Sequence, residues 1–242
     1  DAVLRRISRM VEDGVDIVDI GACSSRLGSV PVGAEEEWRS LAPVLPAVRE
    51  AFPNLRISID TYWSSVVSRT YDAIGDFIVN DISAGEDDPL MLPTVGELGL
   101  AYVAMHKRGT SVNMQQLTDY DDVVADVIAY FESFAQKASK AGIRDWVVDP
   151  GFGFAKTLEQ NYELLAGLNR ICEMGYPVLA GVSRKSMIYK VLDTTPAQAL
   201  NGTTALHWEA LRQGATILRA HDVREAVEVV KLYNTYKKRL PK

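Results

Sequence analysis

The sequence predicts an α/β protein built as a TIM (β/α)8 barrel, with only about seven of the eight βα units visible. Short apolar runs rich in Val and Ile alternate with amphipathic helical stretches along the chain, as in a parallel sheet covered by helices. Most apolar runs end in polar or glycine-rich segments, and the C-terminal ends of barrel strands form the active face of such folds. A doubly wound sheet is disfavoured because neither GxGxxG nor GxxxxGK[ST] occurs.

Each element is assigned from its period and its boundaries. Strands are expected at 15–20, 56–60, 77–82, 101–106, 146–149, 177–182 and 215–219. Helices are expected at 35–51, 64–74, 121–141, 158–174 and 223–238. Without an internal linker or repeat, residues 1–242 are expected to form a single domain.

The strand count is one short of a closed barrel. The chain opens on an amphipathic stretch that looks like the helix after a missing first strand. An open barrel would expose an unpaired parallel edge, which soluble proteins avoid. We therefore expect about one βα unit, roughly 25 to 40 residues, to precede Asp1 in the functional protein.

Composition narrows the class of protein. With 32 acidic and 26 basic residues the net charge is −6, which argues against a nucleic-acid binder with a broad basic face. No apolar run reaches the roughly 18 to 20 residues that a membrane span needs. The only two cysteines, Cys23 and Cys172, are too few for a disulfide scaffold or a zinc cage. A cytoplasmic enzyme with small-molecule substrates is the simplest interpretation.

The segment Asp149-Pro-Gly-Phe-Gly-Phe-Ala-Lys156 is the most informative. A carboxylate ends a strand beside two glycines and two aromatic rings, which would suit a flat ligand rich in N–H groups. The alternative is a tight turn with core phenylalanines. Similarly, Asp60 and Asn80 offer a carboxylate and an amide at neighbouring strand ends, although such a residue taken singly is more often a cap or a buried structural polar group.

Two basic turns suit an anionic ligand. Ser183-Arg184-Lys185-Ser186 follows the sixth strand, and Arg219-Ala220-His221-Asp222 follows the last. Barrel loops in this region often bind phosphate with the help of helix N-termini. The alternatives are a solvated turn for the first, and for the second an arginine paired with a carboxylate and Asp222 as a helix N-cap. His106 could equally be a core histidine, and His207 is interpreted as structural.

The order and spacing of these segments resemble those of dihydropteroate synthase, the pterin-binding TIM-barrel family of folate biosynthesis and the target of sulfonamides. The matching motifs are DIGACSSRLGS at 19–29, SIDT at 58–61, VNDIS at 79–83, AMHKRGT at 104–110, DPGFGFAK at 149–156, GVSRKSM at 181–187 and RAHDV at 219–223. The resemblance implies a transferase that condenses 6-hydroxymethyl-7,8-dihydropterin pyrophosphate with 4-aminobenzoate, giving 7,8-dihydropteroate and pyrophosphate by an SN1-like mechanism.

The resemblance also implies roles for individual residues. Asp60, Asp149, Lys185, Arg219 and His221 would be catalytic. The pterin would be held by Asp60, Asn80, Met105, Asp149, Phe154 and Lys185, the 4-aminobenzoate by Ser25, Arg26 and Ser183, and the pyrophosphate by Arg219 and His221. Mg²⁺ and a homodimer are expected from the same source.

Three departures from the family pattern are visible. The first-strand motif, an Asn followed by Thr-Pro-Asp-Ser-Phe, is absent, and with it the usual metal-binding Asn, so no metal ligand is assigned. Leu27 replaces a proline in the loop over the 4-aminobenzoate site, which bears on sulfonamide affinity, and Cys23 replaces a Glu or Tyr. A non-catalytic pterin-binding homologue and a methyltetrahydrofolate-type methyltransferase remain as alternatives; a phosphosugar barrel would leave Asp60, Asn80 and Asp149 unexplained.

Overall fold

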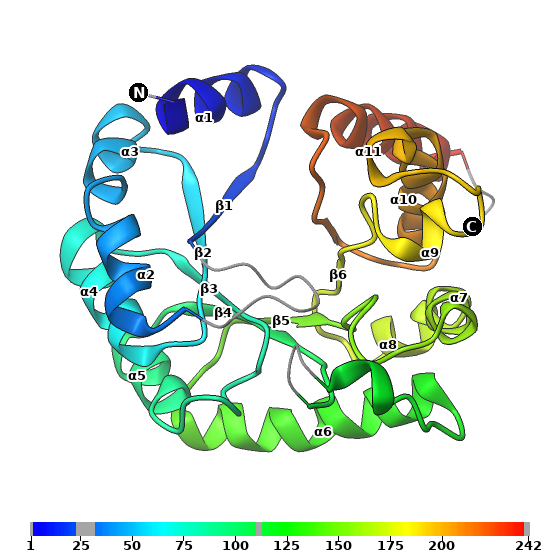
Figure 1. The fold of residues 1–242 in the computed structure, drawn as a ribbon, viewed down its shortest axis with the longest axis horizontal. Coiled ribbons are helices and arrows are strands. Elements are labelled where there is room, and N and C mark those ends of the chain that lie inside the picture. Colours follow the sequence, from blue (N-terminus) through cyan, green and yellow to red (C-terminus); the bar gives the residue numbers. More distant parts are fainter. Residues whose placement is uncertain (1, 23–31, 110–112, 240–242) are drawn as a thin grey trace.

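Parallel strands form a curved inner wall, and the helices surround it on the outside (Figure 1). The computed structural model describes residues 2–22, 32–109 and 113–239. Strands and helices alternate along the chain as the sequence pattern predicts. Within these described residues, no helix is both long and apolar enough to cross a membrane.

The strands form two groups that share one direction. The first sheet has the order β1-β2-β3-β4-β5, and β6 pairs with β7; a bridge between Val148 and Val178 joins the two groups. Their bounds are β1 Ile17–Gly21, β2 Arg56–Asp60, β3 Ile78–Asp81, β4 Ala101–Met105, β5 Trp146–Asp149, β6 Leu179–Ala180 and β7 Ile217–Leu218. All seven lie at the predicted positions, with β1 ending one residue later than expected and β6 and β7 much shorter.

The strand register determines which side chains are neighbours. Asp60 lies opposite Asn80 in the β2–β3 pair, and Met105 lies opposite Asp149 in the β4–β5 pair. Because parallel strands align their carboxyl ends at one edge, four of the residues predicted for the site meet at the same end of the barrel.

Eleven helices lie in the described part of the chain. They are α1 Ala2–Glu12, α2 Ala34–Leu41, α3 Leu45–Ala51, α4 Ser64–Ile74, α5 Met91–Leu98, α6 Val123–Ala141, α7 Leu158–Ala166, α8 Leu168–Cys172, α9 Ser186–Tyr189, α10 Leu200–Arg212 and α11 Val223–Lys237, with short 3-10 turns at Met114–Gln116 and Pro196–Gln198.

Two stretches predicted as single helices each form two helices in the structure. The stretch 35–51 is two helices, α2 and α3, because Pro43 between them lacks an N–H and disfavours a continuous helix. The stretch 158–174 divides into α7 and α8 at Gly167. The sequence pattern does not predict α5, which contains both Pro93 and Gly96; burial of its apolar face overrides its weak intrinsic propensity.

The core lies between the strands and the surrounding helices. Its largest buried side chains include the aromatic rings of Tyr102, Phe131, Phe134 and Phe152. Trp146 of β5 packs edge-on against Phe134 of α6, with 4.9 Å between ring centroids. This packing fixes α6 against β4 and β5, and with it the strand ends that carry Met105 and Asp149.

Candidate active site

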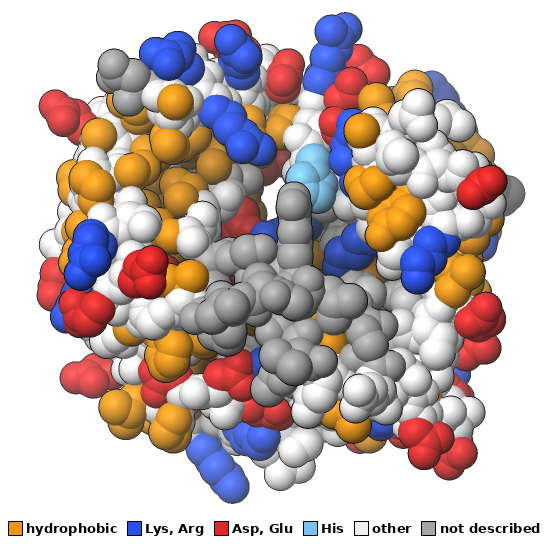
Figure 2. Space-filling view, viewed as in Figure 1, with side chains coloured by type: hydrophobic (Ala, Val, Ile, Leu, Met, Phe, Trp, Pro, Cys, Tyr) orange, Lys and Arg blue, Asp and Glu red, His pale blue; other side chains and the backbone are white. Residues whose placement is uncertain are grey.

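Charged side chains from opposite sides of the barrel meet at the carboxyl ends of the strands. Basic side chains and a histidine border the central opening in Figure 2. Arg219, directly after β7, reaches β2, where its Nη2 lies 3.1 Å from Asp60 Oδ2. It also reaches β1, with Nε 2.8 Å from Asp19 Oδ2. Residues 200 positions apart in the sequence are thereby joined.

Arg219 holds together carboxylates that would otherwise repel one another. Burial is the largest influence on Asp60 and, with the charge of Asp19, raises the pKa of Asp60 to about 7, although Arg219 acts in the opposite direction. Burial also works against the charge of Arg219, but Asp19 and Asp60 outweigh it and raise the pKa of the guanidinium. The site therefore places the Asp60 carboxyl, which titrates near neutral pH, beside the permanently charged guanidinium of Arg219.

Asp149 and Lys185 lie near each other and interact through their charges. A methyl group built on Gly181 would lie 3.9 Å from Lys185 Nζ and 4.0 Å from Asp149 Oδ2. Lys185 Nζ also donates to the carbonyl of Phe152 and lies 5.0 Å from the centroid of the Phe154 ring. Burial lowers the pKa of Lys185 to about 8 while Asp149 opposes that shift, and burial raises the pKa of Asp149.

A buried lysine, Lys156, binds the backbone carbonyls of the loop after β5. Lys156 Nζ lies 3.0 Å from the Gly151 carbonyl oxygen, 3.1 Å from that of Phe154 and 3.0 Å from His106 Nδ1. An ammonium has three N–H bonds, so these three acceptors use all of them. Burial lowers the pKa of Lys156 to about 7 and that of His106 to about 2. His106 is therefore a neutral support of the loop, in line with its interpretation as a core histidine.

Gly151 allows this loop to pass close to β4. Its φ of 71° is in the left-handed region, and a Cβ at this position would lie 1.9 Å from the His106 carbonyl oxygen. Only glycine combines that conformation with that approach. The DPGFGFAK segment is thus a tight turn with core residues, such as the fully buried Phe152, and also a carrier of Asp149 and Phe154.

The two basic turns are joined to each other. The Ser183 hydroxyl lies 2.9 Å from His221 Nδ1 and accepts from the His221 backbone N–H at 3.2 Å. Arg184 turns away from Lys185 and makes two parallel 2.8 Å bonds to Asp222. Asp222 makes no side-chain N-cap bond to α11. The alternative role of Arg219 as an ion-pair partner is correct in part, because Arg219 pairs with Asp19 and Asp60.

The structure brings most of the predicted residues to one place. The set consists of Asp60, Asn80, Met105, Asp149, Phe154, Ser183, Lys185, Arg219 and His221, all at or just after strand ends. Ser25 and Arg26, predicted for the 4-aminobenzoate, lie outside the described residues, as do Cys23 and Leu27. His207 is buried in α10, in keeping with a structural role.

Asp19 is the site residue that the sequence pattern does not single out. It accepts two contacts from Arg219, at 2.8 and 2.7 Å, and a hydrogen bond from Asn80 Nδ2 at 3.2 Å. The motif DIGAC marks it only as a polar residue at a strand end. Its partners lie 61 and 200 residues away, so no local pattern could have shown them.

The described side chains do not form a metal site by themselves. Among them, no group of three or more His, Cys, Asp or Glu residues is placed to hold a metal ion. The end of the site near Arg219, His221 and Lys185 is basic, whereas Mg²⁺ prefers carboxylate, phosphate and water oxygens. The carboxylates nearest to Arg219, those of Asp19 and Asp60, are engaged by its guanidinium.

Fold and site together define a barrel enzyme whose strand ends join a frame of carboxylates and an amide to a basic end. A family model described as pterin binding enzyme matches residues 1–221. Dihydropteroate synthases of Haemophilus influenzae and Escherichia coli are each 39% identical, covering 96% of this chain and 84% and 82% of theirs. The chain belongs to the dihydropteroate synthase family of pterin-binding transferases.

Solved structures agree with this assignment and with the predicted barrel. A Yersinia pestis dihydropteroate synthase in complex with a sulfonamide drug superposes with a TM-score of 0.92 at 34% identity, covering 97% of this chain and 85% of the other. The Thermus thermophilus enzyme in complex with 4-aminobenzoate gives 0.88 at 39% identity, covering 96% and 88%. The predicted TIM-barrel fold class is confirmed.

Replacing Gly151 tests how much the β5 loop depends on its close passage. We expect Gly151→Ala to lose about 1–2 kcal/mol of unfolding free energy for left-handed strain and roughly 1–3 kcal/mol more for the contact with the His106 carbonyl. Gly142→Ala is the matched control, since Gly142 has a φ of 81° and no neighbour within 4 Å of its Cβ position. Equal losses in urea titrations of the two variants would contradict the prediction.

Proposed function

We propose that this chain catalyses the dihydropteroate synthase reaction with the residue roles given below. 6-Hydroxymethyl-7,8-dihydropterin pyrophosphate and 4-aminobenzoate are the substrates, and 7,8-dihydropteroate and pyrophosphate are the products. The observation that carries the proposal is a frame of carboxylates and an amide, from Asp60, Asn80 and Asp149, which lies directly beside the basic groups Lys185 and Arg219. One ligand with a heterocyclic head and an anionic tail uses both parts.

The frame fits the pterin ring. Asp60 and Asp149 supply oxygens for the ring N–H and amino groups, and Asn80 supplies an amide. Lys185, which lies near Asp149, donates to a ring acceptor. Phe154 and the buried Met105 form apolar walls against the faces of the ring.

The basic end fits the diphosphate. When the bond between the pterin methylene carbon and the diphosphate oxygen breaks, negative charge develops on the leaving group and positive charge on the pterin. Arg219 and His221 stabilise the first, and the buried Asp149 carboxylate stabilises the second. The arylamine nitrogen then bonds to the methylene carbon and loses a proton, which completes an SN1-like substitution.

The 4-aminobenzoate is assigned by likeness to solved relatives. One relative structure contains 4-aminobenzoate and another a sulfonamide drug. We place the carboxylate of 4-aminobenzoate near Ser183, whose hydroxyl already interacts with His221, with Ser25 and Arg26 as the further contacts. Sulfonamides would compete for the same place, with an affinity that depends on Leu27.

Mg²⁺ is proposed to enter with the substrate. The described residues offer no cluster of ligands for it, so phosphate oxygens would be its main partners. When bound, the ion would neutralise charge on the diphosphate. A cytoplasmic location and a single domain remain predictions from the sequence.

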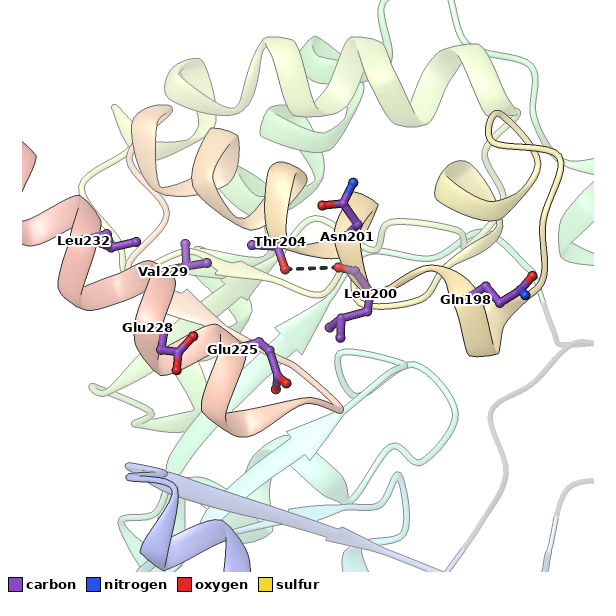
Figure 3. Close-up of a pocket in the computed structure, with 8 residues that line it drawn as sticks. All are labelled: Gln198, Leu200, Asn201, Thr204, Glu225, Glu228, Val229 and Leu232. Atoms are coloured by element: carbon purple, nitrogen blue, oxygen red, sulfur yellow. Dashed lines mark hydrogen bonds between the residues drawn. The ribbon is translucent and has the colours of Figure 1, made fainter.

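A homodimer through the C-terminal helices is the arrangement we infer. A groove of about 520 Å³ lies between α10, the preceding 3-10 turn and α11 (Figure 3). Leu232 on α11 lines it and is 64% exposed, and Tyr236 one turn further along is 47% exposed. Large apolar side chains exposed on adjacent turns of one helix are typical of an interface.

A charge placed in this surface tests the dimer. Leu232→Glu should shift the species measured by light scattering from dimer toward monomer, because burying a carboxylate in an apolar interface is costly. Val191→Glu is a matched control, since Val191 is 56% exposed outside this groove. A dimer equally stable in both variants would place the interface elsewhere.

The ionisation of Asp60 and Lys185 predicts a narrow pH optimum. Asp60 accepts pterin N–H groups as a carboxylate, so kcat/KM should fall as the pH drops through about 7. Lys185 acts as an ammonium, so kcat/KM should fall again as the pH rises through about 8. In Lys185→Arg the basic limb should move to higher pH, because guanidinium stays charged. A flat wild-type profile over this range would contradict the assignment.

Pyrophosphate release distinguishes the proposed reaction from its alternatives. We expect Arg219→Ala to lower kcat/KM for the pterin pyrophosphate by about 10²- to 10³-fold, the loss found when one donor to a developing negative charge is removed. Arg224→Ala is the control, since Arg224 is exposed and forms its ion pair, among the described residues, with Glu228 on its own helix. A methyltransferase would leave the diphosphate intact, and a non-catalytic homologue would bind the pterin in calorimetry without releasing pyrophosphate.

A further inference from the structure

Asp19 has a place in the site that no step of the proposed reaction yet uses. Its side chain is 21% exposed and lies between Arg219 and Asn80. Arg219 approaches a single carboxylate oxygen, Oδ2, with both Nε at 2.8 Å and Nη2 at 2.7 Å. Asn80 Nδ2 approaches the same carboxylate at 3.2 Å from Oδ2 and 3.4 Å from Oδ1.

These contacts determine the orientation of the Asn80 amide. The Asp19 oxygens accept from a guanidinium, which has donors only. They are therefore acceptors toward Asn80 as well, and Asn80 must turn its NH₂ group to them. Its Oδ1 is then the atom left to face the mouth of the barrel, so the amide presents an acceptor and not a donor to a ligand.

The same carboxylate weakens the attraction of Arg219 for an anion. Asp19 and Asp60 both neutralise part of the guanidinium charge at distances of 2.7 and 3.1 Å. A diphosphate that binds Arg219 has to compete with these carboxylates. Asp60 has a second task in holding the pterin, whereas Asp19 remains as the partner that limits how tightly the anion, including the product, is held.

We propose that Asp19 is a positioning residue of this site, which fixes the Asn80 amide with its oxygen toward the pterin and limits the affinity of Arg219 for pyrophosphate. The inference rests on the proposed function, because it takes Asn80 and Arg219 as the pterin and diphosphate contacts. It predicts effects of opposite sign on two ligands, which a general loosening of the fold cannot produce.

The test is Asp19→Asn, studied by calorimetry with two separate probes at fixed Mg²⁺. The introduced amide can keep an oxygen toward Arg219 but offers an NH₂ group that allows Asn80 to turn over. Affinity for 6-hydroxymethyl-7,8-dihydropterin should fall by about tenfold, as expected for a mispaired buried hydrogen bond. Affinity for inorganic pyrophosphate should rise roughly two- to fivefold, because one partly exposed counter-charge is lost.

A swapped pair tests the orientation of the amide directly. Asn80→Asp alone puts two carboxylates against each other and should also weaken pterin binding by about tenfold. Combined with Asp19→Asn, the amide at position 19 donates to a carboxylate at position 80, which again presents an oxygen to the pterin. The double variant should therefore recover pterin affinity to within about threefold of wild type, a non-additivity expected of contacting residues.

Asp16→Asn is the matched control, since Asp16 lies just before β1, is 88% exposed and forms its ion pair, within the described part of the chain, with the surface residue Arg56 at 4.0 Å. Thermal unfolding of every variant separates loss of fold from loss of binding.

The proposal is overturned if Asp19→Asn lowers the affinity for the pterin and for pyrophosphate together, if it leaves the pterin affinity unchanged, or if the swapped pair does not restore the pterin affinity. Failure of the wild-type protein itself to bind the pterin would instead overturn the proposed function.

Discussion

The carboxylates at the mouth of this barrel repel one another, and the site exists because one arginine lies among them. Asp19 and Asp60 come from adjacent strands, so their charges are forced together by the sheet itself. Arg219 arrives from the other sheet and contacts both. A charge withdrawn from water is tolerated only with a partner. These ion pairs therefore link β7, whose backbone pairs with β6, to the β1–β2 pair of the other sheet.

Lys156, which is buried, and Arg184, which is partly exposed, support the loops that carry the residues proposed to touch ligands. Lys156 fixes the loop that carries Phe154 by bonding its backbone carbonyls. Arg184 joins the turn after β6 to the turn after β7 through Asp222, and to the 3-10 turn before α10 through the carbonyls of Pro196 and Ala197. Lys156 and Arg184 thus support the loops, whereas Lys185 and Arg219 lie beside the carboxylates Asp149, Asp19 and Asp60.

The order of the elements and most of the site can be predicted from the sequence, because both follow from local patterns. Predicted strands of four to six residues carry Asp60, Asn80 and Asp149 at or near their ends, and the parallel register then aligns them. The helix breaks at Pro43 and Gly167 are not predicted, since the amphipathic period continues across them. Asp19 and the direction of Arg184 are not predictable either, because each is decided by partners that are far away in the sequence.

The two sheets differ in the length of their strands, and this difference affects how the protein opens locally. Five strands of four or five residues form one sheet, whereas β6 and β7 pair over only two residues each. Local opening begins where few backbone hydrogen bonds hold a region, so the amides of β6 and β7 should exchange with solvent before those of β1 to β5. Lys185 and Arg219 follow the short strands β6 and β7, whereas Asp149 and Asp60 end strands β5 and β2 of the five-stranded sheet. A ligand that contacts both sheets therefore stabilises the β6–β7 pair against local opening. Part of its binding free energy is then measured as slower hydrogen exchange of β6 and β7.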